Sequence, residues 1–110
     1  MIFDRQGSTT VITKESVSLK TFVDRLIDSY DKIKQENLII NLFSLHKITL
    51  SDLLLFLEIS NRHRQQKKSF VIVTDKLNYR EVPDELVVVP TMQEAYDVIA
   101  IEDMERDMEF

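Results

Sequence analysis

The chain has 110 residues, of which 44% are hydrophobic and 30% are charged, and its formal net charge is −5. This length suits one domain with a single core, and the negative charge argues against nucleic acid, which is bound by neutralising its phosphates. Because the chain has no cysteine, a disulfide framework, a thiol nucleophile and a cysteine-based zinc site are all excluded.

The first predicted element is a β-hairpin. Two short segments with strand character, Ile2–Gln6 and Thr9–Lys14, flank Gly7, the single glycine of the chain. Glycine in a tight turn between two such segments is typical of a hairpin. Loops that cradle phosphates need several glycines, so neither a P-loop nor a dinucleotide-binding fingerprint can be assembled from this sequence.

An amphipathic helix follows the hairpin. Its apolar positions recur at helical spacing and are Leu19, Phe22, Val23, Leu26, Ile27, Tyr30 and Ile33. Ser18 is a suitable N-cap and Asn37 a suitable stop. The pattern therefore predicts one helix that continues to about Ile33.

The remaining elements alternate between strands and helices. They are a strand over Leu38–Phe43, a helix over Ser51–Gln66, strands over Phe70–Val73 and Leu86–Val89, and a helix from Met92. Thr91 and Glu94 have the spacing of a capping box for the last helix. The three strands are continuous apolar runs, as parallel strands covered on both faces are. We predict an α/β fold with a mostly parallel sheet of four to five strands, crossover helices and an N-terminal β-hairpin.

The strand, loop and helix over Leu38–Leu57 resemble the centre of the STAS domain (sulfate transporter and anti-sigma factor antagonist). The order of elements is similar over nearly the whole chain, and Val89–Ala95 resembles the closing strand and helix start of that family. In STAS domains the central loop presents a phosphorylatable serine or threonine at the start of a helix. The resemblance implies a bacterial regulatory module that binds another protein.

The phosphorylation motif of the family is degenerate in this chain. Thr49 stands where the family's loop has Asp, Leu50 at the phosphorylated position, and Asp52 at the Gly, while Asn41 stands where the strand often ends in Asp. A leucine side chain cannot accept a phosphoryl group. We therefore expect no switch at the family's usual site.

Thr49 and Ser51 are the hydroxyl side chains beside that position, and two interpretations apply to them. Phosphate at a helix N-terminus is stabilised by exposed N–H groups and by the helix dipole, which would make either residue a phosphosite. Either residue is also a good N-cap, and Thr49 with Asp52 has nearly the spacing of a capping box. We favour the cap.

The helix after this loop carries the predicted partner interface. On a helical wheel, the residues that face the sheet are Leu50, Leu53, Leu54 and Leu57. Leu55 and Ile59 point away from it. The predicted interface consists of Leu55, Ile59, Phe56, Ser51, Asp52, Arg62 and His63. On this interpretation Leu54→Asp unfolds the domain, while Leu55→Asp combined with Ile59→Lys leaves it folded. The alternative is that these are scattered exposed apolar residues without a role.

Charged groups elsewhere give weaker signals. The acidic segment at about 102–110 either frays or docks on something basic, because a helix C-terminus disfavours negative charge. Three apolar residues there form a second outward stripe that could contact a partner, namely Ile101, Met104 and Met108. The two histidines, His46 and His63, lack the spacing of a metal site.

We therefore predict one STAS-like domain over residues 1–110 that acts as a non-catalytic protein-binding module and needs no cofactor, metal or nucleotide. A helix needs about 18–20 apolar residues to span a bilayer, and no apolar run in the chain approaches that length. The first residues form no signal peptide, so the expected location is cytoplasmic, without membrane contact. The partner is another protein of unknown identity, and a homodimer is an open alternative. Two further functions stay open: an accessory subunit of a larger complex or enzyme, and a receiver-like phosphoacceptor, which would need more carboxylates than Asp75 beside Asn41.

Overall fold

The computed structural model describes residues 2–77 and 79–108. In chain order the elements are β1 (Ile2–Gln6), β2 (Thr9–Thr13), α1 (Leu19–Asp28), α2 (Tyr30–Ile33), β3 (Asn37–Asn41), α3 (Leu50–Leu54), α4 (Leu57–Gln65), β4 (Phe70–Val73), the 3-10 helix η1 (Tyr79–Glu81), β5 (Val87–Val89) and α5 (Met92–Asp107).

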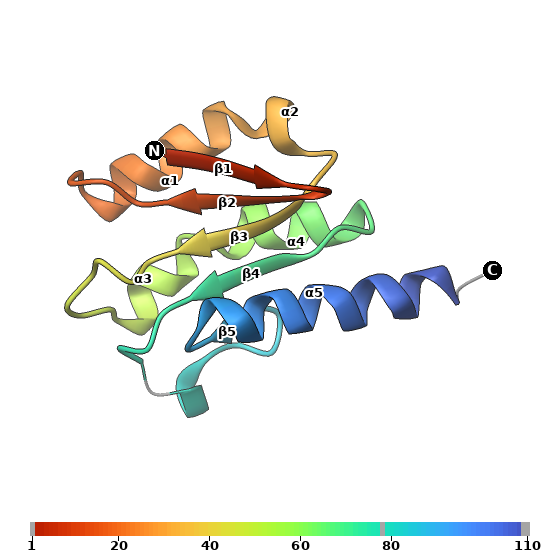
Figure 1. Cartoon of the computed structure of the whole chain (residues 1–110). Coiled ribbons are helices and arrows are strands. Elements are labelled where there is room, and N and C mark those ends of the chain that lie inside the picture. The colour runs from red at the N-terminus through yellow and green to blue at the C-terminus, as the bar shows by residue number, and fades with distance from the viewer. Residues whose placement is uncertain (1, 78, 109–110) are drawn as a thin grey trace.

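The five strands form one sheet whose spatial order, β1-β2-β3-β4-β5, is the order of the chain (Figure 1). β1 pairs with β2 in an antiparallel manner, and β2, β3, β4 and β5 pair in parallel with one another. Gly7 has a φ of +62°, the left-handed conformation that the hairpin turn requires. The predicted α/β fold, with its hairpin and mostly parallel sheet, is confirmed.

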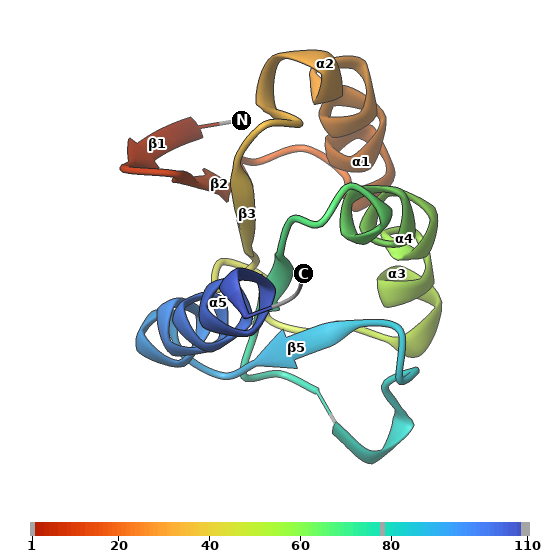
Figure 2. The same ribbon diagram turned by 90° about the vertical axis from the view of Figure 1, so that its right-hand side faces the viewer.

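Helices cover both faces of this sheet. α1, α2, α3 and α4 lie on one face and α5 lies on the other (Figure 2). Side chains alternate along β3, so that Leu38 and Ile40 join the larger core under α1 to α4, while Ile39 joins the smaller core under α5. All three are fully buried, and this two-sided burial explains why the strand is a continuous apolar run.

The first predicted helix is divided at Ser29 into α1 and α2. Its N-cap is confirmed, because the Thr21 N–H donates to the Ser18 Oγ at 3.1 Å. At the division the Ser29 N–H donates to the Arg25 carbonyl, and the Lys32 N–H to the Ser29 carbonyl, each at 3.0 Å. The second bond spans three residues instead of four, so the chain turns more tightly there than in an α-helix.

The acidic segment is helical to Asp107 and is docked, while Glu109 lies outside the described residues. The Glu102 carboxylate accepts from Arg64 Nη1 at 3.1 Å and from the buried Ser69 hydroxyl at 2.5 Å. Asp103 pairs with Arg106, one turn along the same helix. In the described part of the chain, no helix is both long and apolar enough to cross a membrane.

Candidate functional site

The loop between β3 and α3 is held by hydrogen bonds to neighbouring backbone and by two buried side chains. The Leu42 N–H donates to the Val73 carbonyl at 2.9 Å, and the Phe43 N–H donates to Asn41 Oδ1 at 3.1 Å. Leu42 and Ile48 are buried at the two ends of this loop. The start of α3 is therefore presented from a fixed position at the end of β3 (Figure 1).

Thr49 caps α3 with a complete capping box. The Asp52 N–H donates to Thr49 Oγ1 at 3.1 Å, and the Thr49 N–H donates to Asp52 Oδ2 at 2.9 Å. The predicted role of Thr49 as a cap is confirmed by these bonds. Leu50 follows as the first helical residue with 38% of its surface exposed, and Ser51 is exposed beside it.

The predicted helix over Ser51–Gln66 is two helices, α3 and α4. Between them the Leu55 N–H donates to the Asp52 carbonyl at 3.2 Å, and the Phe56 N–H to the Leu53 carbonyl at 3.0 Å. Both bonds span three residues, as in a 3-10 helix. A 3-10 helix has about three residues per turn, so the side chains at positions i, i+3 and i+6 lie on the same side. This change of phase directs Leu53, Phe56 and Ile59 together toward the core.

The predicted interface is therefore wrong for three of its members. Phe56 and His63 are fully buried, and Ile59 is 4% exposed, so none of them can meet a partner at the surface. Leu54, which was predicted to face the sheet, has 44% of its surface exposed, and Leu55 has 40%. The wheel assumed one uninterrupted helix, and the tight turn at Leu55 and Phe56 invalidates that assumption.

A different apolar surface results from this arrangement. We define the α3 surface as Leu50, Ser51, Leu54 and Leu55. Leu50 and Leu54 lie one turn apart on the same side of α3, so their side chains are neighbours. Phe43, in the loop that leads to α3, is a further large apolar residue with 42% of its surface exposed. Three of the four α3-surface residues are thus leucines in contact with solvent.

His63 has a structural environment that the sequence did not reveal. Its Nε2 lies 2.7 Å from the Glu36 carbonyl oxygen, which can only accept, so Nε2 carries the proton. Nδ1 then accepts from the Tyr30 hydroxyl at 2.8 Å. The Arg62 guanidinium lies 4.9 Å from the centre of the Tyr30 ring and makes a cation–π contact with it. His63 and Arg62 therefore join α4 to α2 and to Glu36, the residue before β3.

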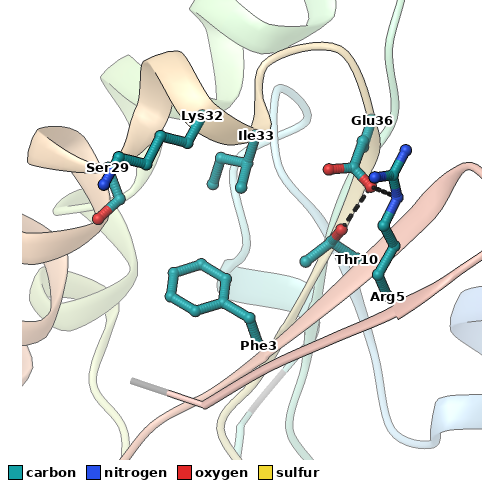
Figure 3. A pocket seen from close by; sticks show the side chains of 7 residues that line it. All are labelled: Phe3, Arg5, Thr10, Ser29, Lys32, Ile33 and Glu36. Atoms are coloured by element: carbon teal, nitrogen blue, oxygen red, sulfur yellow. Dashed lines mark hydrogen bonds and ion pairs between the residues drawn. The ribbon is translucent and has the colours of Figure 1, made fainter.

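A hollow of about 290 Å³, which no local sequence pattern indicates, lies between the hairpin and α2 (Figure 3). Its lining residues are Phe3, Arg5, Thr10, Ser29, Lys32, Ile33 and Glu36. The Glu36 carboxylate accepts from Arg5 Nε at 2.7 Å and from the Thr10 hydroxyl at 2.8 Å. These partners are far apart in sequence, and pairing of β1, β2 and β3 brings them together.

The residues considered for metal or phosphoacceptor chemistry have other contacts. Asp75 lies 3.5 Å from Lys76 Nζ, and Asn41 accepts from the backbone of the loop. His46 is exposed, whereas His63 is in the core. Among residues 2–77 and 79–108, no three histidine, aspartate or glutamate side chains are grouped so that they could hold a metal ion.

The fold is STAS-like, as the sequence predicted. A solved structure of RsbS from Moorella thermoacetica, in a variant with serine replaced by glutamate, superposes with a TM-score of 0.61. The alignment covers 90% of this chain and 96% of that chain at 14% sequence identity. No protein-family model matches the sequence, and no curated protein matches it. The likeness thus concerns the fold.

Proposed function

We propose that the chain is a non-catalytic protein-binding module of the anti-sigma factor antagonist type, and that it binds another protein through the α3 surface. The observation that carries the proposal is the exposure of Leu50, Leu54 and Leu55, between 38% and 44% each, on one short helix. Clustered exposed apolar residues, here beside the half-buried Asp52 of the cap, are typical of an interface. Three leucines and a serine are suited to binding and supply no group for proton transfer.

The energy available from this surface is enough for a specific contact. Complete burial of a leucine side chain stabilises by about 1.5–3 kcal/mol, so covering the exposed part of each leucine contributes roughly 1 kcal/mol. Phe43, if the partner reaches the neighbouring loop, adds a similar amount. A few well-buried residues of this kind carry most of the binding energy in many complexes.

We further propose that this binding is not controlled by phosphorylation at the family's usual position, because Leu50 has no hydroxyl group. The Thr49 hydroxyl is already engaged in the cap of α3. Ser51 is exposed and remains the candidate phosphosite of the two. The absence of a hydroxyl at Leu50 also favours the second function, a constitutive accessory subunit of a larger complex.

The test replaces two exposed leucines by charged residues, in the variant Leu50→Asp with Leu54→Asp. A matched control places the same charges on the opposite side of the sheet, in Ile101→Asp with Met104→Asp, at residues that are 57% and 64% exposed. Each protein is immobilised, and native lysate proteins that it captures are quantified by mass spectrometry.

We expect both variants to melt within a few degrees of the unmodified chain, since exposed sites change stability by about 0.5 kcal/mol. A protein that the unmodified chain and the control both capture should be lost from the Leu50→Asp, Leu54→Asp variant, because a charge in an interface core must be desolvated without a partner. If the α3 variant retains every captured protein, the α3 surface is not the binding site. Loss of the same protein from the control variant instead would place the site on α5.

A further inference from the structure

β1 has the more exposed of the two edges of the sheet. It pairs with β2 on one side, and no described strand lies on its other side, so a row of backbone N–H and C=O groups faces outward (Figure 1). All five residues of β1 are exposed, including Ile2 at 53% and Phe3 at 45%. A strand of this kind is a template for pairing with another strand.

The opposite edge is less available. β5 has three residues against five in β1, and its side chains are half-buried. Pro90 follows it directly and cannot donate a hydrogen bond to a ladder. A contact between two β1 strands is also closed by a two-fold axis, whereas a contact between β1 and β5 would continue from copy to copy.

Charges usually protect exposed edges, and β1 has two, Asp4 and Arg5. The Arg5 charge is compensated within the chain, because Nε lies 2.7 Å from Glu36 Oε2 and the Glu36 side chain is 10% exposed. Asp4 therefore carries the charge that an added strand has to accommodate. Its position decides which alignment of the two strands is favourable.

We propose that a second copy of this chain pairs its β1 with β1 of the first in an antiparallel manner, about a two-fold axis at Phe3, and so joins the two sheets. This inference concerns a surface other than the α3 surface and goes beyond the proposed function. The pairing would satisfy the outward backbone groups of both edge strands around Phe3. It would leave two α3 surfaces on one dimer, which can increase avidity for a partner with repeated sites.

The alignment follows from symmetry and charge. A two-fold axis perpendicular to the joined sheet keeps the helix-covered faces of the two copies on the same sides. Residues that are directly opposite must then point to the same face, so the axis lies midway between one residue of β1 and its own copy. An axis at Asp4 would oppose two carboxylates, and an axis at Arg5 two guanidinium groups, and like charges directly opposite are destabilising. An axis at Phe3 opposes two aromatic rings, a favourable cross-strand pair, and places Ile2 beside Asp4 of the second copy.

The hollow beside the hairpin gives these rings a place. Phe3 and Arg5 extend from the same side of β1, Phe3 toward Ile33 of α2 and Arg5 toward Glu36 (Figure 3). A second Phe3 ring on that face would lie at the mouth of the hollow of about 290 Å³. Burial of Phe3, now 45% exposed, would then add to the backbone hydrogen bonds.

Single cysteines test the alignment, because the chain contains no cysteine of its own. Opposite residues of an antiparallel pair have Cα atoms about 4.5–5.5 Å apart, within the range that a disulfide bridges. Phe3→Cys should form a covalent dimer under mild oxidation. Asp4→Cys, displaced from the axis, and Met104→Cys, 64% exposed on α5, should remain monomeric on non-reducing gels. Cross-linking of Asp4→Cys or Met104→Cys to the same extent would overturn the proposal.

Sedimentation velocity tests the assembly without cross-linking. The unmodified chain should sediment as a dimer that dissociates on dilution, and Phe3→Lys as a monomer with an unchanged melting temperature, since Phe3 is at the surface. Ile101→Lys, an equally exposed apolar site on α5, should sediment as the unmodified chain does. A monomeric unmodified chain at every concentration, or a dimeric Phe3→Lys, would show that β1 does not pair. If Phe3→Lys fails to fold, the cysteine variants decide.

Discussion

His63 shows what a single buried polar residue contributes to this fold. Both ring nitrogens are hydrogen-bonded, and the ring makes edge contacts with Tyr30 and Phe70 at centroid distances of 5.5 Å and 6.3 Å. Burial, more than any other cause, lowers the pKa of His63 from 6.5 to about 4. The hydrogen bond to the Glu36 carbonyl acts in the opposite direction and is outweighed.

This pKa predicts a loss of stability in mild acid. The unfolded chain binds a proton at His63 below about pH 6.5, whereas the folded chain does so at about pH 4. The free energy of unfolding contributed by the neutral ring is therefore fully present above pH 6.5 and is lost as the pH falls from 6.5 to about 4. A pKa difference of this size corresponds to about 3 kcal/mol.

Urea denaturation at several pH values between 4 and 7 measures the effect. His63→Asn is the control, because asparagine does not titrate, and its stability should vary less with pH over the same interval. That variant is less stable at pH 7, since it disturbs the bonds to Tyr30 and Glu36, so the comparison concerns the slope. A histidine NMR signal, absent from His63→Asn, that titrates near pH 6.5 would contradict the prediction.

At the scale of the element, the tight turn between α3 and α4 reverses the mutational expectations drawn from the helical wheel. Leu54→Asp should leave the fold intact, with a change in stability of about 0.5 kcal/mol, because Leu54 is 44% exposed. Ile59→Lys should destabilise by about 4 kcal/mol or more, because it places a charge at a core site that is 4% exposed.

Urea denaturation followed by circular dichroism distinguishes these two variants. Ile59→Val is the matched control, a smaller apolar residue at the same site, and should cost about 0.5–1.5 kcal/mol. If Ile59→Lys unfolds at the same urea concentration as Leu54→Asp, or at a higher one, Ile59 does not lie in the core.

The strands could be predicted from the sequence because each is decided locally. Phe70–Val73 was predicted with its observed bounds, and the apolar runs of β3 and β4 directly indicated burial on both faces. The caps at Ser18, Thr49 and Thr91 were also readable, since each side chain bonds to an N–H three residues away.

The divisions within the helices could not be predicted from the same pattern. Ser29 and Phe56 are compatible with an uninterrupted helix, and packing against the sheet selects the tighter turn. The members of the predicted interface depended on the turn between α3 and α4. Leu50 and Leu54 were therefore assigned to the core, and Ile59 to the surface, in the opposite sense to the structure.

At the scale of the molecule, α5 is the helix that covers the second face of the sheet (Figure 2). Its C-terminal end is held by a polar network. Ser69 is central to this network: its hydroxyl donates to Glu102 at 2.5 Å and accepts from Arg106 Nη2 at 3.0 Å. Asn37 Nδ2 adds hydrogen bonds of 3.3 Å to the Asp103 carboxylate. The negative charges near the C-terminus of α5, unfavourable for the helix itself, are thus compensated by contacts with Asn37 of β3, Ser69 before β4 and Arg64 of α4.

Ser69→Ala should loosen the end of α5 while the rest of the domain keeps its structure. Glu102 and Arg106 each lose one hydrogen bond, which we expect to cost about 1–2 kcal/mol. Amide hydrogen exchange should accelerate over residues 102–107 and change little in β3. Asp97→Ala, which removes an exposed bond to Gln93 of 3.0 Å on the same helix, is the control and should leave exchange at 102–107 unchanged. Equal exchange in both variants would show that the network does not hold α5.

The order of the strands in the sheet has a consequence for how the chain folds. Because that order is the order of the chain, every strand docks on a neighbour that has already been synthesised, and the hairpin can form before the rest of the chain exists. Each parallel pairing encloses one crossover connection, so no pairing has to wait for a strand further along the chain. The sheet can therefore grow from β1 toward β5 as the chain leaves the ribosome, with α5 covering the second face as the last step.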